Sequence, residues 1–217
     1  MKEALSGGNT TATSTIHPIA QKVIAEAKRI VDSGYQEGPN NDTIFGKWFG
    51  LNFNPWCAMF VSWCFKEAGA SHLIASQSSK GFASCTYGMK HFANKGQLVP
   101  IAQAQPGDIV FFNFDNDTSD AEHVGIVLAN DKKKKILKTA EGNTSAPANK
   151  KGSQSNGDGA YFKDRPYTYC FVVARPNWDA PAPKAAPKKG AAKKAAPAKK
   201  APVKKSVGGG GKGAVAL

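Results

Sequence analysis

Apolar residues recur at helical spacing in the segment that follows Pro18. The other face of this segment is polar, Gly34 ends the pattern, and the apolar positions are Ile19, Val23, Ala27, Ile30 and Val31. Because positions three or four residues apart share one face of a helix, this spacing predicts an amphipathic helix. The preceding residues 1–15 are small and polar, and we expect them to fray.

A second helix is predicted to begin at Asn54 and Pro55. Asparagine can cap free backbone amides, and proline is preorganised for the first helical position. Cys57 would then be about the third helical residue, and Gly69 would end the helix as a C-cap. The residues between them are mostly apolar, so we expect this helix to be largely buried.

Two other segments in the first half of the chain carry weaker patterns. Residues 37–54 are rich in Gly and Asn with aromatic residues interspersed, which indicates an irregular loop held by aromatic anchors. A short third helix is expected over residues 86–94.

After Pro106 and Gly107 the apolar pattern becomes strand-like. Turn residues separate four segments rich in Val, Ile, Phe and Tyr, namely 109–114, 123–129, 135–140 and 169–175. Asn130 and Asp131 indicate a hairpin turn between the second and third of these segments. Residues 143–163 show no strand pattern and are expected to form a long loop. Helices followed by a run of strands predict an α+β domain with a mostly antiparallel sheet.

Charge is distributed unevenly along the chain. Residues 1–180 carry a net charge of +3, whereas residues 181–217 contain ten lysines and no acidic residue. This tail of Ala, Lys and Pro has no hydrophobic periodicity and is predicted to be disordered. We therefore expect a flexible segment over 1–15, one folded domain over 16–179, and a disordered basic tail over 180–217 that ends in a Gly-rich segment.

Composition also argues against several classes of protein. The longest apolar stretch, residues 56–65, is about half the ~20 residues that a membrane helix requires. The first residues lack the apolar centre of a secretory signal. The sequence thus indicates a soluble protein that is not inserted in a membrane. Four cysteines without any C-x-x-C spacing indicate reduced thiols rather than a disulfide scaffold.

Cys57 is the candidate nucleophile. A thiol near a helix N-terminus lies at the positive end of the helix dipole, which favours the thiolate and lowers the pKa. The alternative is an inert cysteine in the core. Cys64 lies two turns into the same helix among apolar neighbours and is expected to be structural, as are Cys85 and Cys170.

His123 is the candidate base, because histidine is the side chain best matched to proton transfer near neutral pH. It begins an apolar strand that would hold the ring rigidly, and Gly125 would leave open space on the same face. A merely buried or exposed histidine is the alternative. The other three histidines, His17, His72 and His91, lie at polar helix ends, where exposure or capping is expected.

An imidazole base needs an acceptor that fixes its tautomer. Glu141 and Asn143 lie at the end of the next predicted strand, two residues apart and hence on one face. Glu122 is adjacent to His123 and would point to the opposite side of its strand. A surface position for Glu141 is the alternative.

Four blocks in fixed order carry a family resemblance: NPWCAMFVSWC at residues 54–64, QPGDIVFF at 105–112, HVGIV at 123–127 and EGNT at 141–144. Over about residues 18–176 the chain closely resembles the CHAP domain, the cysteine, histidine-dependent amidohydrolase/peptidase family of cell-wall lytic enzymes. The resemblance implies a papain-like fold with helices packed on the sheet. By this similarity Cys57 corresponds to the nucleophile, His123 to the base, and Glu141 with Asn143 to the residues that orient it.

The same resemblance implies hydrolysis of an amide or peptide bond of peptidoglycan, and we expect a monomer that needs no cofactor. The absence of a visible signal peptide resembles phage endolysins, which accumulate in the host cytoplasm before they reach the wall. A virion-associated lysin and a bacterial enzyme exported by another route are the alternatives.

A second hypothesis is a polyanion-binding protein with an inactive papain-like domain and the lysine-rich tail as its functional part. Ten positive charges would give salt-sensitive affinity for nucleic acid or for anionic wall polymers. The tail offers no aromatic residue on which bases could stack. A tether to anionic wall polymers therefore fits the tail better.

Metal sites are not favoured by the sequence. C-x-x-C and H-E-x-x-H zinc motifs are absent. Some relatives hold calcium in an Asp-rich loop before the nucleophile, but here that segment offers only Asp42, and affinity depends on the number of charged ligands. No metal is therefore expected.

Overall fold

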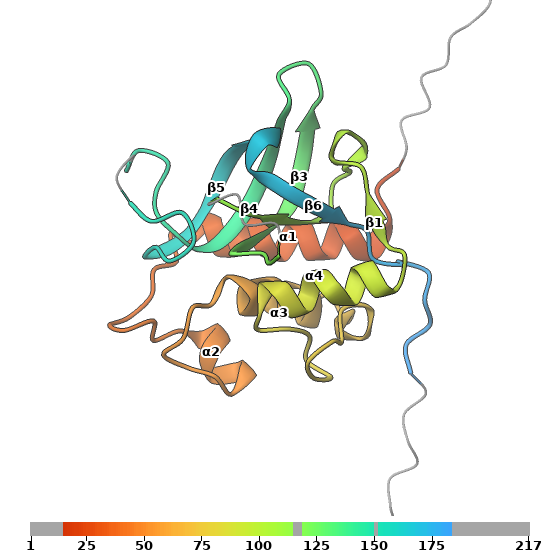
Figure 1. Cartoon of the computed structure of the whole chain (residues 1–217). Helices are drawn as coiled ribbons and strands as arrows, with labels where there is room; N and C mark the ends of the chain where they lie inside the picture. The colour runs from red at the N-terminus through yellow and green to blue at the C-terminus, as the bar shows by residue number, and fades with distance from the viewer. Residues whose placement is uncertain (1–14, 115–118, 150–151, 184–217) are drawn as a thin grey trace, which may run out of the picture. The chain divides into compact units, whose positions relative to one another are not determined.

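The computed structural model describes residues 15–114, 119–149 and 152–183 (Figure 1). The predicted flexible segment 1–15 and basic tail 180–217 lie almost wholly outside these residues. The helices are α1 Pro18–Asp32, α2 Ile44–Phe49, α3 Cys57–Glu67 and α4 Cys85–Asn94, with short 3₁₀ turns at Ser71–Leu73, Ile101–Gln103 and Tyr167–Tyr169. Within the described part of the chain, no helix has the length and apolarity needed to cross a bilayer.

The first helix, α1, matches the predicted amphipathic helix. The side chain of His17 caps it by accepting a hydrogen bond from the Ile19 amide, so His17 has a capping role. Gly34 follows the helix with a positive φ of 68°, a conformation that glycine adopts without strain. The buried face consists of Ala20, Val23, Ile24, Ala27 and Ile30.

Helix α2 lies within the segment that was expected to be irregular. Its six residues are too few to show a periodic pattern, and local hydrogen bonds define it instead. The hydroxyl of Thr43 accepts from the Gly46 amide at the start, and Gly50 ends the helix in a left-handed conformation with φ of 93°. The expectation of aromatic anchors in this segment holds for Phe45, which is completely buried.

The start predicted for α3 was wrong by about two residues. The Asn54 side chain donates to the Leu51 and Asn52 carbonyls instead of accepting from helix amides. Trp56 takes the N-cap position without a side-chain capping bond, so Cys57 is the first helical residue. The consequence for the candidate nucleophile is small, because Cys57 still lies in the first turn.

Six strands of the described residues form one antiparallel sheet in the order β1-β6-β2-β3-β4-β5. Their bounds are β1 Leu98–Val99, β2 Ile109–Phe112, β3 His123–Asp131, β4 Ile136–Thr144, β5 Gly159–Pro166 and β6 Cys170–Ala174. This arrangement confirms the predicted α+β fold class, with N-terminal helices packed on an antiparallel sheet, and it is consistent with a papain-like fold.

Two strands were not predicted, and the more important is β5. It lies partly in the segment expected to be a loop, and its sequence, GAYFKDRP, lacks a continuous apolar face. Pairing with β4 nevertheless buries Lys163 and Arg165, which are 7% and 4% exposed. Strand β4 itself continues to Thr144, so Glu141 and Asn143 lie within the strand and not just beyond it.

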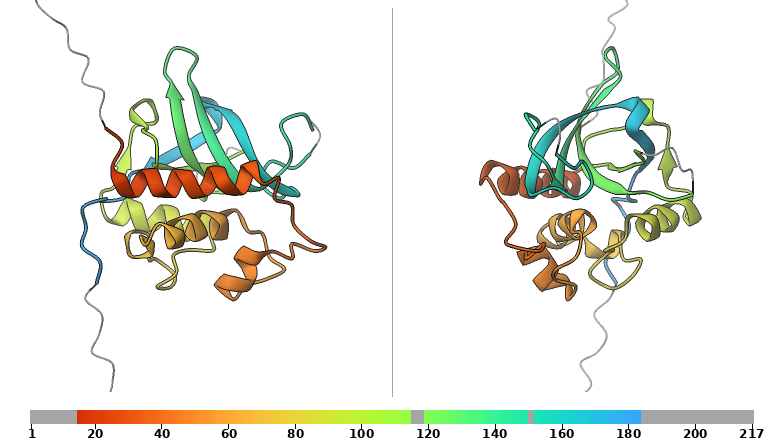
Figure 2. Two further views of the ribbon diagram at one scale, coloured as in Figure 1. Left: turned by 180° about the vertical axis from the view of Figure 1, so that it is seen from behind. Right: turned by 60° about the vertical axis from the view of Figure 1, so that its left-hand side comes forward.

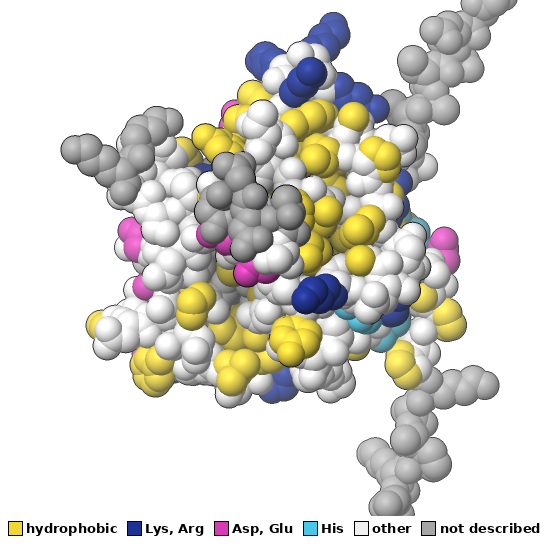
Figure 3. All heavy atoms as spheres, viewed as in Figure 1, with side chains coloured by type: hydrophobic (Ala, Val, Ile, Leu, Met, Phe, Trp, Pro, Cys, Tyr) yellow, Lys and Arg dark blue, Asp and Glu magenta, His cyan; other side chains and the backbone are white. Residues whose placement is uncertain are grey.

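The β3–β4 hairpin is present, but its turn follows Asp131. The Asp131 side chain accepts a hydrogen bond from the Lys134 amide, which stabilises the turn. The residues at the tip, Lys132–Lys135, are all exposed and form a basic cluster, which we call the hairpin lysines (Figures 1 and 3).

Alternate strand residues divide the core between the two faces of the sheet. Phe111, Val124, Ile126 and Ala140 pack with α1, α3 and α4, whereas the other face carries Val110, Phe112, Val127, Leu137 and Val173. Helix α3 contacts α1, β3 and β4, with the strands on one side of the helices (Figure 2). The N-terminus of α3 is thereby positioned against the two strands that carry His123 and Glu141.

Candidate active site

A close approach between α3 and β4 depends on Gly142. A Cβ added at this position would lie 2.7 Å from the Cβ of Phe60 and would clash with the ring of Trp56, which is completely buried. Because real Cβ atoms essentially never come this close, a side chain larger than hydrogen would push the strand away from the helix. Gly142 therefore allows Cys57 and Glu141 to share one site.

Cys57 begins α3 and is 4% exposed. Its position confirms the expectation of a thiol at a helix N-terminus, where the helix dipole favours the thiolate. The sulfur also lies close enough to His123 for each group to shift the pKa of the other.

His123 is completely buried at the start of β3, and its Nε2 lies 2.9 Å from Oε2 of Glu141. The other ring nitrogen, Nδ1, is also buried and has no well-aligned hydrogen-bond partner among the described residues. Phe112 stacks on the ring at 5.7 Å between centroids, so the imidazole is fixed by packing as well as by Glu141.

Glu141 has no exposed surface and bonds to three side chains. Besides His123, it accepts from Nε of Arg165 at 2.8 Å and from the hydroxyl of Thr139. Nη2 of Arg165 also reaches Oε2, so the guanidinium binds the carboxylate through two nitrogens. The surface alternative for Glu141 is thus ruled out.

Arg165 is the residue of this site that sequence reasoning missed. It comes from the unpredicted strand β5, and no local motif marks it as a partner of Glu141. Its guanidinium lies over the rings of Phe112 and Phe114 and also donates to Gln154. A prediction that paired β5 with β4 would have been the only route to it.

The charges of the site shift the three candidate groups in a consistent direction. Burial alone would raise the pKa of Glu141, but Arg165 and His123 outweigh burial and lower it to about 2. Burial likewise opposes the charged form of His123, yet Cys57 and Glu141 raise its pKa to about 9. A hydrogen bond from Cys85, opposed by burial and assisted by His123, brings the pKa of Cys57 well below its ordinary value. These directions favour a Cys57 thiolate beside a His123 imidazolium.

Cys85 was expected to be structural like Cys64, but the structure places it beside the candidate nucleophile. Cys85 begins α4, and its Sγ lies 3.5 Å from Sγ of Cys57. Its own pKa is raised, mainly by Cys57, because two adjacent sulfurs do not both ionise readily. Cys64 and Cys170 are also buried, and burial raises the pKa of each thiol, for Cys170 to about 12.

Asn143 is less closely joined to the other candidates. It has a positive φ of 59°, and the β4–β5 register is irregular between Glu141 and Thr144, so simple alternation does not extend to it. Its Nδ2 donates to the Ser155 carbonyl, while its buried Oδ1 has no hydrogen-bond partner among the described residues. The structure therefore groups Cys57, His123 and Glu141, and it links Asn143 to a neighbouring loop.

Two residues set aside by the sequence lie away from this group. Glu122 precedes β3, and its side chain accepts a hydrogen bond from the Phe114 amide. Asp42, which lies in the segment where some relatives hold calcium, pairs with Lys47 and Asn52. Across residues 15–114, 119–149 and 152–183, no three His, Cys, Asp or Glu side chains form a cluster that could hold a metal ion.

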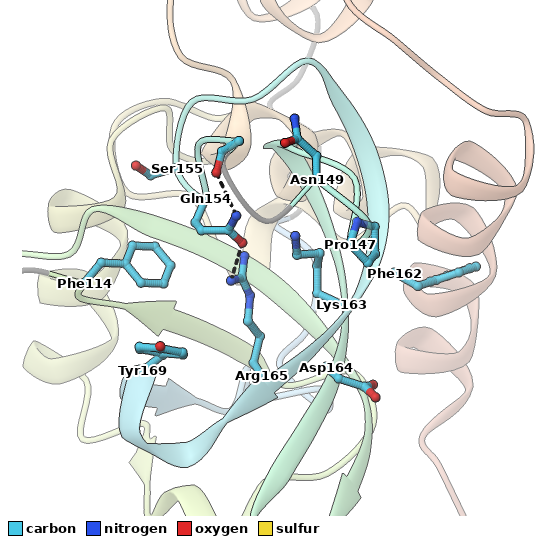
Figure 4. A pocket seen from close by; sticks show the side chains of 11 residues that line it. Phe114, Pro147, Asn149, Gln154, Ser155, Phe162, Lys163, Asp164, Arg165 and Tyr169 are labelled. Carbon is cyan, nitrogen blue, oxygen red and sulfur yellow. Dashed lines mark hydrogen bonds between the residues drawn. The ribbon is translucent and has the colours of Figure 1, made fainter.

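A pocket of about 940 Å³ adjoins the site through shared side chains (Figure 4). Arg165 lines it while binding Glu141, and Phe114 lines it with its ring centroid 6.2 Å from that of His123. The rest of the lining mixes polar and aromatic groups, including Gln154, Lys163 and Tyr169. Figure 4 shows the hydrogen bond from Arg165 to Gln154, two residues that both line the pocket.

Comparison with known proteins agrees with this geometry. Residues 49–143 match the model of the CHAP domain family, a range that includes all four candidate residues. A protein described as probable endopeptidase p60 of Listeria seeligeri is 30% identical over 108 residues, which make up 50% of this chain and 16% of that protein. Residues 49–143 are thus similar to a CHAP domain, and the chain spans only a small part of this distant relative.

Proposed function

We propose that this protein hydrolyses an amide or peptide bond of bacterial peptidoglycan, with Cys57 as the nucleophile. The observation that carries the proposal is the buried chain of Cys57, His123 and Glu141, in which the nucleophile lies at a helix N-terminus. The CHAP domain match supports the class of reaction, and the endopeptidase description of the relative supports a peptide bond as the target.

The reaction begins with attack of the Cys57 thiolate on the carbonyl carbon of the substrate. The oxyanion that forms lies near the start of α3, where the Cys57 amide is not used by the helix and can donate to it. His123 then gives its proton to the leaving amine, which produces an acyl-enzyme. Water activated by His123 hydrolyses this intermediate and returns the thiolate.

Glu141 orients the imidazole and stabilises its protonated form, the part that an aspartate or asparagine takes in other catalytic triads. Arg165 acts through Glu141, because two nitrogens of its guanidinium fix the carboxylate. We propose that Asn143 does not contact the reacting atoms and instead positions the end of β4.

The test is digestion of purified cell walls followed by mass spectrometry of the released fragments. New amino termini within the stem or cross-bridge peptides would identify an endopeptidase, whereas free muramic acid lactyl groups would identify an amidase. The Cys57→Ala protein, checked for folding by circular dichroism, serves as the matched control. Equal release of fragments by both proteins would refute the mechanism.

The same preparation separates the alternative function. Strong, salt-sensitive binding to DNA without any release of wall fragments would favour a polyanion-binding protein with an inactive domain. A phage endolysin and a bacterial wall enzyme both agree with the proposed chemistry, so the test uses walls of several peptidoglycan types.

A further inference from the structure

Two thiols meet at the start of two helices. Cys57 is the first residue of α3 and Cys85 the first residue of α4, and their sulfurs lie 3.5 Å apart. Both side chains are nearly buried, with 4% and 7% of their surface exposed. The mechanism proposed above uses the first thiol and gives the second no chemical step.

The distance between these sulfurs is fixed by the structure around them. The buried hydroxyl of Ser62, on α3, donates to the Phe82 carbonyl at 2.7 Å and accepts from the Phe82 amide at 3.0 Å. Phe82 in turn packs against Gly88 of α4, where an added Cβ would lie 2.7 Å from its ring. The segment that ends at Cys85 is therefore attached to the helix that begins with Cys57.

We propose, on the basis of the function assigned above, that Cys85 is a resolving cysteine. When a hydroperoxide oxidises Cys57, Cys85 captures the oxidised sulfur as a Cys57–Cys85 disulfide, which inactivates the enzyme reversibly. The pair thus forms a redox switch built around the nucleophile.

The chemistry balances in two steps. The Cys57 thiolate attacks the outer oxygen of the hydroperoxide, forming an S–O bond and breaking the O–O bond, and the released alkoxide or hydroxide takes a proton from His123. This gives a sulfenic acid on Cys57. The Cys85 sulfur then attacks that sulfur and displaces the oxygen, which leaves as water with the Cys85 proton. An added dithiol reduces the disulfide and restores both thiols.

The geometry suits the second step. Bond formation requires the sulfurs to approach from 3.5 Å to about 2.05 Å, which side-chain rotation at two helix ends can supply. Cys85 becomes more reactive at the same moment. The hydrogen bond to Cys57 is the largest cause of the raised pKa of Cys85, followed by burial and then by the negative charge of Cys57. Conversion of Cys57 to a sulfenic acid removes that charge. Cys64 and Cys170 have no sulfur partner of this kind among the described residues.

The direct test treats the intact wild-type protein with a small excess of hydrogen peroxide and maps its thiols. Trypsin places Cys85 in residues 81–90 and both Cys57 and Cys64 in residues 48–66. A linked pair of these peptides, which dithiothreitol separates, is expected from the wild type. The link should persist in Cys64→Ala protein and disappear in Cys57→Ala protein. Absence of the linked pair from peroxide-treated wild type would overturn the proposal.

A second measurement follows activity on purified walls. Peroxide should lower wild-type activity by at least about tenfold, because only the thiolate is nucleophilic, and dithiothreitol should restore most of it. In Cys85→Ala protein the sulfenic acid has no partner and proceeds to sulfinic acid, so activity should not return. Cys64→Ala and Cys170→Ala proteins are the matched controls and should recover like the wild type.

The two readouts separate this inference from the proposed function. Formation of the linked peptides requires no hydrolytic activity, so it decides the switch even if the protein cleaves no wall. Hydrolysis without a linked peptide would leave the function standing and refute the switch. Full recovery of Cys85→Ala protein after peroxide would likewise refute it. If that variant does not fold, Cys85→Ser takes its place, and the wild-type peptide map still decides.

Discussion

The side chain of Glu141 lies directly over Gly125, two residues along β3 from His123. A Cβ added at Gly125 would be 2.7 Å from Cγ of Glu141. The space that the glycine leaves on the His123 face is therefore filled by the carboxylate that binds the imidazole. Neighbouring strands β3 and β4 thus build the base and its partner from one close contact.

Gly125→Ala tests this contact. The methyl group should displace Glu141 from His123 and Arg165, and we expect wall hydrolysis to fall by about tenfold to a hundredfold, the usual effect of a misplaced catalytic group. The comparison is the rate per folded molecule, with the folded fraction taken from thermal unfolding. Wild-type activity in a folded Gly125→Ala protein would contradict the role given to this packing.

Cys57→Ala and Cys64→Ala form a matched pair on one helix. Loss of the nucleophile should reduce hydrolysis by on the order of a thousandfold or more while the protein stays folded. Removal of the buried Cys64 sulfur should leave the rate per folded molecule unchanged and cost about 1 kcal/mol of stability. Turbidity loss of cell walls and thermal unfolding measure the two effects. A lytic Cys57→Ala protein would end the proposed mechanism.

The pH profile reports the thiolate–imidazolium pair. The pKa of His123 is raised to about 9, so the imidazolium persists through neutral pH and is lost as the pH rises through about 9. The pKa of Cys57 is lowered, so the thiolate is retained below its ordinary range. We expect kcat/KM to be high at neutral pH and to fall near pH 9.

Glu141→Gln should shift this profile in a defined direction. The carboxylate raises the pKa of His123, and its removal should move the alkaline limb to lower pH as well as lower the rate. Measurement of kcat/KM against pH on a soluble wall peptide checks both effects. An alkaline limb that stayed in place would show that Glu141 does not act on His123.

Arg165→Met should destabilise the protein by about 3–5 kcal/mol, because the buried Glu141 carboxylate then loses its cationic partner. Arg175→Met is the control, since it removes the partner of the buried Asp108 while Arg175 itself is partly exposed. It should affect stability without lowering the rate per folded molecule. Denaturant unfolding measures the stability of each variant, and wall assays measure its rate per folded molecule. Equal loss of activity in both variants would argue against a specific role for Arg165.

Positive charge outside the site is expected to affect wall binding and not chemistry. A protein ending at Pro183 lacks the ten lysines of the tail but keeps every residue that the structure describes. It should cleave a small soluble wall peptide at the same rate and bind intact walls less well in dilute salt. Salt at 0.1 M screens the attraction between the tail lysines and anionic wall polymers beyond about 10 Å, so the tail contributes most to binding when salt is dilute.

Serine at each of the hairpin lysines removes four positive charges from the β3–β4 hairpin, compared with the ten that the shortened protein loses. If this variant lost wall binding as the shortened protein did, net charge and not the tail would be responsible. Equal wall binding by the shortened and the full-length protein at every salt concentration would show that the tail is not a tether.

Local pattern was sufficient for much of the fold and for naming three of the candidate site residues. The 3.6-residue periodicity of α1 and the apolar runs of β2, β3 and β6 depend on residues close in sequence, which the chain itself displays. Cys57 and His123 were identifiable because a thiol at a helix start and a histidine at a strand start have local signatures. Glu141 followed from its place at the end of the next strand.

The remaining features depend on contacts between residues far apart in the chain. Strand β5 has little strand pattern of its own, and its pairing with β4 decides that Arg165 is buried against Glu141. The 3.5 Å contact of Cys57 with Cys85 exists because Ser62 of α3 binds Phe82 in the segment that leads into α4. Sequence thus determined which residues could do the chemistry. Tertiary structure decided which partners set their charges, because electrostatic interactions and hydrogen bonds act only over a few ångströms in space.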